Sequence, residues 1–128
     1  MSYRLINNGS YLEIKLAGKF DFLKIETILD AIITHKNWYP GGMLLVDETQ
    51  FDASSKTFSD INHIVEFIDN RMLAFENSKI ALYVSRELEY GLNRMLITLA
   101  EDVLKLNINV FRSRQEALSW LLSAIPAE

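Results

Sequence analysis

Two neighbouring groups of polar side chains are the first candidates for chemistry in this chain. Asp47 and Glu48 directly follow a short apolar run, and an acidic pair at the carboxyl end of a buried strand could act on a ligand. The structural alternative is that Asp47 accepts backbone N–H groups in a turn. We favour this alternative, because the sequence offers no recognisable titratable partner for the pair.

A hydroxyl-rich segment runs from Asp47 to Ser59 and predicts a loop that opens a helix. A phosphate near a helix start would be favoured by the helix dipole. Helix capping and loop solvation would explain the same hydroxyl groups without any modification. The candidate phosphoacceptors, which together with Asp47 could form a loop for a partner, are Ser54, Ser55, Thr57 and Ser59.

Metal and cofactor chemistry finds little support in the sequence. His63 and Glu66 lie three residues apart on one helical face, but His35 is the only other histidine, and metal sites usually need three or four ligands. The chain has no cysteine and no Ser-His-Asp arrangement with recognisable spacing. A glycine-rich phosphate loop would follow a strand, whereas Gly41 and Gly42 precede one. We therefore expect no metal, no cofactor and no enzymatic activity.

Composition and charge narrow the class of protein further. The 128 residues are of single-domain size, and 49% hydrophobic with 23% charged residues suit a globular protein with a core. With 13 basic and 17 acidic residues, the net charge of −4 lacks the positive field that attracts nucleic acid. We expect one domain over residues 1–128 and no nucleic-acid partner.

Targeting signals are the next class to consider. Residues 1–9 contain no basic region followed by an apolar core, which argues against a signal peptide. No apolar run approaches the roughly 20 residues that span a bilayer. We therefore expect no transmembrane segment and a cytoplasmic location.

The elements that must position the candidate residues begin with a β-hairpin. Asn8-Gly9 is a strong hairpin signal, because a type I′ turn needs two residues that tolerate positive φ. If Asn7 opposes Ser10, apolar residues meet on one side and opposite charges on the other. The predicted pairs are then Leu5 with Leu12, Tyr3 with Ile14, and Arg4 with Glu13, with Leu12, Ile14 and Leu16 towards the core and Glu13 and Lys15 outward.

Helices and strands alternate after the hairpin. One helix opens near Asp21 and carries His35 and Lys36 in its last turn, and the apolar strand 43–46 follows. A helix between two strands predicts a right-handed parallel crossover. The later predicted elements are a helix with core positions Ile61, Ile64, Val65, Ile68 and Met72, the strand 79–84, the long helix 87–104, the strand 108–111, and a final helix with Ala117, Leu118, Leu121 and Ile125 inward, stopped by Pro126.

Side chains that can cap helices precede three of these helices. Thr57 or Ser59 could cap the helix after the hydroxyl-rich segment, and Ser85 could cap the long helix. Ser113 and Glu116 have the spacing of a capping box. Together the patterns predict a single α/β domain with a mixed, mainly parallel sheet led by an N-terminal hairpin.

Six segments spread over nearly the whole chain stand in a characteristic order. They are Gly18-Lys19-Phe20-Asp21, His35 with Trp38, Leu44-Leu45-Val46-Asp47, Tyr90-Gly91-Leu92-Asn93-Arg94-Met95, Val110-Phe111-Arg112-Ser113 and Glu116-Ala117-Leu118-Ser119-Trp120-Leu121. In this order they resemble the SpoIIAA-like family, whose fold is shared by STAS domains and, more distantly, by CRAL-TRIO lipid-binding domains. The resemblance implies a β-α superhelical winding and no settled activity.

The chain departs from that family at one functional position. In the fold family that the chain resembles, regulatory STAS proteins carry a phosphorylatable serine at the start of the helix after the third strand, in a tight Asp-Ser-Ser/Thr-Gly context. The corresponding region, 47–59, contains hydroxyl groups, but it lacks the glycine and is longer. The resemblance therefore assigns the phosphoacceptor to no single residue here.

The long helix is apolar on two sides. Its expected core stripe consists of Leu88, Leu92, Met95, Leu99 and Val103. A second stripe, with residues about seven apart, consists of Tyr90, Ile97 and Leu104. The second stripe predicts a wide core contact, a surface of a two-fold homodimer, or a wall of an apolar ligand site.

Two functional hypotheses follow for the chain. The first is a non-enzymatic STAS-like regulatory module that binds a protein partner through the loop Asp47–Ser59 and the adjoining helix. The second is a carrier or sensor of a small apolar ligand or lipid, as the CRAL-TRIO resemblance implies. Additional apolar side chains that could serve the second hypothesis are Tyr83, Tyr90, Ile97 and Trp120.

Overall fold

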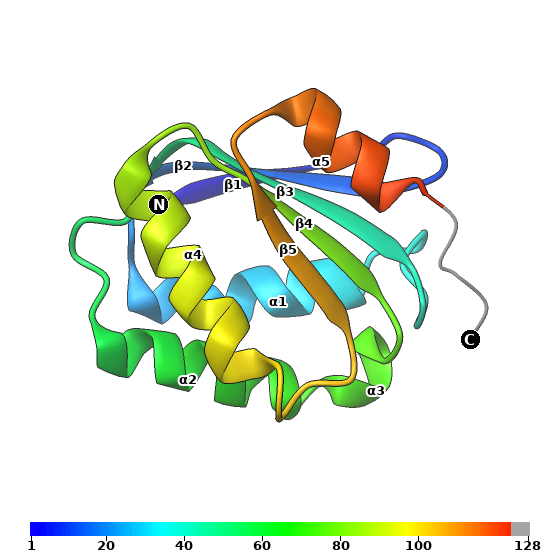
Figure 1. Ribbon diagram of the computed structural model, residues 1–128. Helices are drawn as coiled ribbons and strands as arrows, with labels where there is room; N and C mark the ends of the chain where they lie inside the picture. Colours follow the sequence, from blue (N-terminus) through cyan, green and yellow to red (C-terminus); the bar gives the residue numbers. More distant parts are fainter. Residues whose placement is uncertain (124–128) are drawn as a thin grey trace.

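A five-stranded sheet forms the centre of the computed structural model, which describes residues 1–123 (Figure 1). The strand order is β1-β2-β3-β4-β5, where β1 is antiparallel to β2 and the other neighbours are parallel. This mixed, mainly parallel sheet confirms the predicted fold class. The strands are β1 (Ser2–Asn7), β2 (Leu12–Lys19), β3 (Met43–Asp52), β4 (Lys79–Tyr83) and β5 (Asn107–Phe111).

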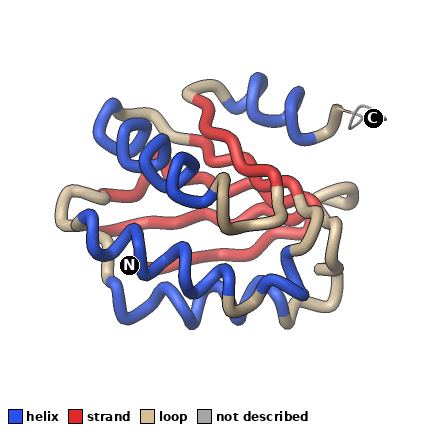
Figure 2. Tube along the Cα trace, turned by 60° about the horizontal axis from the view of Figure 1, so that its bottom comes forward, coloured by secondary structure: helices blue, strands red, loops and turns tan. Residues whose placement is uncertain are grey.

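Helices cover the two faces of the sheet unequally, with four on one face and α5 alone on the other (Figures 1 and 2). Leu44 and Leu45 point to opposite faces and are both buried, so β3 is covered on both sides as predicted. The helices are α1 (Ile25–Ile33), which follows a 3-10 turn at Phe22–Lys24, α2 (Phe58–Asp69), α3 (Met72–Phe75), α4 (Glu87–Ala100) and α5 (Arg114–Leu121).

The N-terminal hairpin forms, but the predicted register is wrong by two residues. Asn7 pairs with Leu12 instead of Ser10, so the hairpin loop contains the four residues 8–11. Gly9 adopts the positive φ of 84° that the turn requires, and its N–H donates to Asn7 Oδ1. A shift by two preserves which side chains face the core, and it places Arg4 opposite a different residue.

The new partner of Arg4 is Lys15, and Glu13 is not solvent-facing as predicted. Glu13 is 2% exposed on the sheet face that α5 covers. Arg114, the first residue of α5, donates to both Glu13 oxygens at 3.0 and 2.7 Å, and Asn8 Nδ2 donates at 2.9 Å. A buried carboxylate needs such partners, and they lie outside the hairpin's own cross-strand pairs.

Strand β3 is longer than predicted, because it continues beyond Val46 to Asp52. Its second half pairs with the end of β2, where Lys19 lies opposite Asp52. Between these halves, Glu48 and Thr49 lie opposite the single residue Leu16, which is a β-bulge. The predicted loop from Asp47 to Ser59 is therefore reduced to a short connection, 53–57, before α2.

The buried face of α4 also differs from the prediction. Three residues of the predicted core stripe, Leu88, Met95 and Val103, are 44%, 38% and 50% exposed. The buried positions of the helix are instead Glu89, Asn93, Leu96 and Ala100. Two of these four are polar, and they are turned inward because they have hydrogen-bonding partners in the interior, which a hydrophobic pattern does not reveal.

Several helix ends differ in detail from the predicted ones. α1 ends at Ile33, so His35 and Lys36 follow the helix, and Met72 belongs to α3 instead of α2. The α4 N-cap is Arg86, without a capping side-chain bond, and Ser85 does not cap it. Ser113 caps α5 by accepting from the N–H of Glu116. The predicted inward Ile125 and the stop at Pro126 lie outside the described residues.

Candidate functional site

The predicted acidic pair is divided between the two faces of the sheet. Asp47 Oδ1 accepts from the N–H and the Oγ1 of Thr49, at 2.9 and 2.7 Å, which is the structural role favoured from the sequence. Glu48, at the β-bulge, points to the other face and is 6% exposed. The two carboxylates therefore cannot act on one ligand together, and only Glu48 faces the interior between the sheet and α1, α2 and α4.

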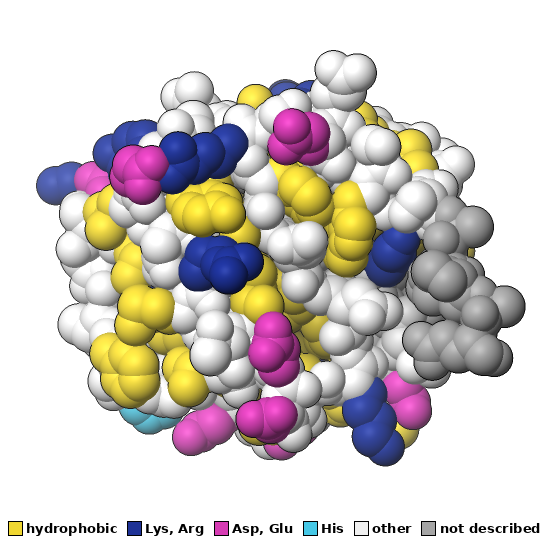
Figure 3. Space-filling model, in the orientation of Figure 1, with side chains coloured by type: hydrophobic (Ala, Val, Ile, Leu, Met, Phe, Trp, Pro, Cys, Tyr) yellow, Lys and Arg dark blue, Asp and Glu magenta, His cyan; other side chains and the backbone are white. Residues whose placement is uncertain are grey.

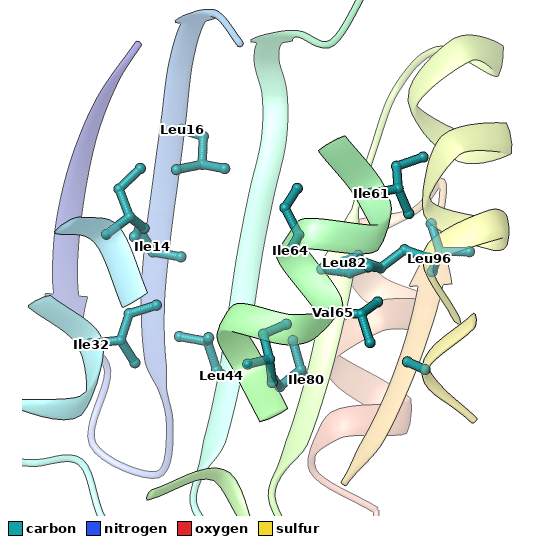
Figure 4. Packing of buried hydrophobic residues seen from close by; sticks show 14 of the residues in the cluster. Ile14, Leu16, Ile32, Leu44, Ile61, Ile64, Val65, Ile80, Leu82 and Leu96 are labelled. Carbon is teal, nitrogen blue, oxygen red and sulfur yellow. The ribbon is translucent and has the colours of Figure 1, made fainter. Parts of the chain in front are cut away.

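An apolar cavity of about 120 Å³ lies in that interior. Ile14, Leu44 and Leu82 line it from the sheet, and Ile32 and Ile64 line it from the helices. Figure 4 shows these side chains converging from β2, β3, β4, α1 and α2. A cavity with such walls can hold an apolar molecule, as an engineered cavity of about 150 Å³ holds benzene.

Val46 is a local sign of this cavity. It lies on the central strand β3 between Ile14 of β2 and Leu82 of β4, with helices above it, yet it is only half-buried. Val46 is one of the residues that line the cavity, so its accessible surface faces that empty space. The inner face of the sheet is therefore incompletely filled at its centre.

One end of the cavity is polar. Its polar lining side chains are Glu48, Lys56 and Asn93, which come from β3, the connection 53–57 and α4. Asn93 is 2% exposed, and its Nδ2 donates to both oxygens of Glu48 at 3.2 Å. The cavity thus combines an apolar body with a small polar group of fixed orientation, which is the usual design of a small-molecule site.

Burial determines the protonation tendencies of the two ionisable groups. It raises the pKa of Glu48, although the charge of Lys56 and the hydrogen bond from Asn93 act in the opposite direction. Burial likewise lowers the pKa of Lys56, against the charges of Glu48 and Glu89. The Lys56 ammonium lies 5.1 Å from the centre of the Phe20 ring and 5.5 Å from that of Phe51. Glu48 is buried, whereas the Lys56 side chain is half-buried, and no close ion pair joins them within residues 1–123.

A second buried carboxylate supports this polar end from outside the cavity. Glu89 is 1% exposed, and its oxygens accept from Arg86 at 2.6 and 2.7 Å and from the Ala53 N–H at 2.9 Å. Burial alone would raise the pKa of Glu89, but the bonds from Arg86 and Ala53 outweigh it and lower the pKa. Glu89 therefore links the start of α4 to the connection that carries Lys56.

The candidate phosphoacceptors have unequal structural roles. Of the two predicted caps, Thr57 is the N-cap of α2, and together with Asp60 it forms a capping box. Ser54, Ser55 and Ser59 are all exposed. Ser55 Oγ lies 3.4 Å from the Phe20 carbonyl, and the Ser54 N–H donates to Asp52 Oδ1 at 2.9 Å. Helix capping accounts for the Thr57 hydroxyl group. Phosphorylation of any of the four hydroxyl groups stays a prediction.

His63 and Glu66 remain on the exposed side of α2. The His63 ring packs edge-on against Phe22 at 5.7 Å, and Nδ1 lies 3.5 Å from Ser59 Oγ. Within residues 1–123, no group of three or more histidine or carboxylate side chains could hold a metal ion.

The second stripe of α4 does not form one surface. Leu104 is 7% exposed in the core, beyond the end of the helix. Tyr90 is half-buried under the guanidinium of Arg112, 4.6 Å from its ring centre. Ile97 is half-buried and shares a surface depression with Trp120. Neither Tyr90 nor Ile97 lines the central cavity, and a role of this stripe in ligand binding or in a dimer stays a prediction.

Sequence patterns missed Lys56, Glu89 and Asn93 as members of the candidate site. One signal was present: Glu89, Asn93, Leu96 and Ala100 follow the spacing of a single helical face, on which two polar residues replace apolar ones. For Lys56 no such signal exists, because its place depends on how the connection 53–57 folds back over the sheet.

The sheet order, the N-terminal hairpin and the helix placement define an α/β protein with a SpoIIAA-like fold. The solved structure that carries this assignment is that of an uncharacterised protein of the DUF3478 family from Shewanella loihica PV-4, described as having a SpoIIAA-like fold. It matches with a TM-score of 0.60 and 18% identity, over 94% of this chain and 92% of that chain.

The similarity concerns the fold alone. The sequence matches no protein-family model and no curated protein. The predicted resemblance to SpoIIAA-like proteins is confirmed for the fold, whereas the relation to CRAL-TRIO domains stays a prediction. In the described part of the chain, no helix has the length and apolar character to cross a membrane.

Proposed function

We propose that the protein binds a small apolar ligand in the central cavity and serves as its carrier or sensor, without enzymatic activity. The observation that carries this proposal is the cavity of about 120 Å³, with apolar walls and one polar end. Leaving such a space unfilled lowers stability, because the lining side chains lose packing contacts. A ligand that fills the space would restore those contacts.

Benzene is the first probe for this proposal, because its size suits a cavity of this volume. We expect benzene to shift the methyl NMR signals of lining residues such as Leu44 and Ile64. Val46→Phe should abolish these shifts, because the strand directs the added ring into the cavity. Val103→Phe, the same substitution at an exposed position, is the matched control. Unchanged benzene binding by a folded Val46→Phe variant would refute the cavity as the site.

A protein-interaction module is the second candidate, and an exposed apolar surface favours it. Phe58, at the start of α2, and Met95, on α4, are 57% and 38% exposed and line one shallow depression. Leu88, about two turns before Met95, is 44% exposed. Figure 3 shows hydrophobic side chains gathered on the side of the molecule that α4 forms. The simplest partner for such a surface is a second copy of this chain.

Sedimentation velocity tests this second candidate. We expect the wild type to sediment as a dimer and Met95→Glu as a monomer with an unchanged circular dichroism spectrum, since a charge on the seam would lose hydration without gaining a partner. Leu73→Glu, on α3 at an 87% exposed position, is the control and should remain dimeric. A monomeric wild type would refute the proposed self-association.

A further inference from the structure

The polar end of the cavity restricts the chemistry of the ligand beyond its size. Glu48 has two carboxylate oxygens with about four acceptor sites, and the only hydrogen bonds they receive within residues 1–123 come from one Asn93 nitrogen. Each of these bonds is 3.2 Å long, at the long end of the normal range. Glu48 therefore has acceptor capacity left for a ligand.

Lys56 supplies the complementary donor. Its side chain lines the same cavity, and its ammonium takes part in no hydrogen bond and no ion pair among residues 1–123. The two aromatic rings beneath it offer only a cation–π attraction. An ammonium can donate three hydrogen bonds, so Lys56 is available to a group placed between it and Glu48.

Charge decides what kind of group fits between them. A carboxylate head would add a negative charge beside Glu48, and Glu89 is also close enough to act on that position. An ammonium head would add a positive charge beside Lys56. Next to the buried Glu48 carboxylate and the half-buried Lys56, an extra charge without its own counter-ion is unfavourable. A neutral group that both donates and accepts avoids this cost, and a hydroxyl group is the smallest of these.

We propose, building on the cavity function above, that the ligand is a small apolar alcohol whose hydroxyl group donates to Glu48 and accepts from Lys56. The Asn93 Nδ2 holds the Glu48 carboxylate in place. The hydrocarbon part lies among the isoleucine and leucine side chains of the cavity. The volume fits a ligand of about five to seven non-hydrogen atoms, comparable with benzene.

Four probes separate this proposal from the cavity function itself. Isobutanol, isobutylamine and isobutyrate share one carbon skeleton and differ in the charge of the head group, and benzene has no head group. Affinities are measured by NMR titration at neutral pH. In the wild type we expect isobutanol to bind more tightly than both charged probes. Tighter binding of isobutyrate or isobutylamine would overturn the neutral head group.

Single substitutions then test the two hydrogen-bonding residues. Lys56→Met and Glu48→Met keep the approximate length of the side chain and remove the donor or the acceptor. Each should weaken isobutanol binding about tenfold more than it weakens benzene binding, the loss expected for one hydrogen bond, so the ratio of the two affinities is the readout. Lys36→Met, at an exposed position after α1, is the control and should change neither affinity. Circular dichroism verifies that each variant is folded.

The outcomes distinguish the two proposals. If benzene and isobutanol both fail to bind the wild type, the cavity function is wrong. If both bind and the Lys56→Met and Glu48→Met variants keep the wild-type ratio of isobutanol to benzene affinity, only the assignment of the hydroxyl group is wrong. Should Glu48→Met fail to fold, Lys56→Met decides the assignment alone, because the Lys56 side chain makes no hydrogen bond within residues 1–123 that the fold would lose.

Discussion

Arg114→Leu should lower the free energy of unfolding by about 2–3 kcal/mol. Within residues 1–123, the substitution leaves the buried Glu13 carboxylate with only Asn8 as a hydrogen-bond donor. Breaking a fully buried ion pair costs about 3–5 kcal/mol, and the value is smaller here because the Arg114 side chain is 39% exposed. Urea unfolding of the two proteins measures the difference.

A double substitution and the pH dependence test whether the loss of the Glu13–Arg114 ion pair causes the destabilisation. Glu13→Met combined with Arg114→Leu should recover most of the loss, because an apolar pair can replace a buried ion pair at little cost. In the wild type, Arg114 lowers the pKa of Glu13, so this pair stabilises the fold above the ordinary carboxyl pKa of 4.5, and the contribution disappears as the pH falls through the lowered value.

The Arg114→Leu variant should show the opposite sign. Without the guanidinium, burial raises the pKa of Glu13, so the folded state takes up the proton at a higher pH than the unfolded state. The deficit relative to the wild type should therefore shrink as the pH falls from neutral towards 4.5. A deficit that is constant over this range would mean that Arg114 stabilises the protein by packing alone.

Glu48→Gln should stabilise the protein at neutral pH. Burial raises the pKa of Glu48 in the folded state, which means that the ionised carboxylate opposes folding. Each unit of raised pKa corresponds to about 1.4 kcal/mol of lost stability at a pH above both values. Glutamine has nearly the same shape, and its carbonyl oxygen can still accept from Asn93.

The gain should depend on pH in a defined direction. Below 4.5, the ordinary value of the group, Glu48 is protonated in both states, and the gain from Glu48→Gln should disappear. Glu66→Gln, on the exposed side of α2, serves as the control. Thermal unfolding from pH 4 to pH 8 measures both variants. A gain that does not decline at low pH would contradict the burial of an ionised Glu48.

Local patterns predicted most of the fold. The Asn8-Gly9 turn and the alternating residues around it placed the hairpin, and the apolar runs at Leu44 and Ile80 indicated a sheet covered on both faces. The register and the end of β3 could not be predicted in this way. They depend on Glu13 meeting Arg114 and on Asp52 lying opposite Lys19, which are contacts between distant parts of the chain.

The candidate site was harder to predict from the sequence than the fold. Glu48 was recognised as a carboxylate near the end of a strand, but that it faces a cavity shared with Lys56 and Asn93 depends on how distant parts of the chain pack. Asn93 was assigned to no role, because a hydrophobic pattern places polar residues outside. The cavity has no sequence signal at all, since it is the volume that the isoleucine and leucine side chains leave unfilled.

The contact between Glu13 and Arg114 joins residues 101 positions apart and has a consequence for the order of folding. Until α5 has been synthesised, Leu45 and Ala81 lie on an uncovered face of the sheet, and Glu13 has no cation beside it. Closing so long a loop is slow, because its entropy must be lost before the contact forms. During synthesis, the chain can therefore first form the sheet face that carries the cavity. Folding becomes fully cooperative only when α5 docks on the opposite face.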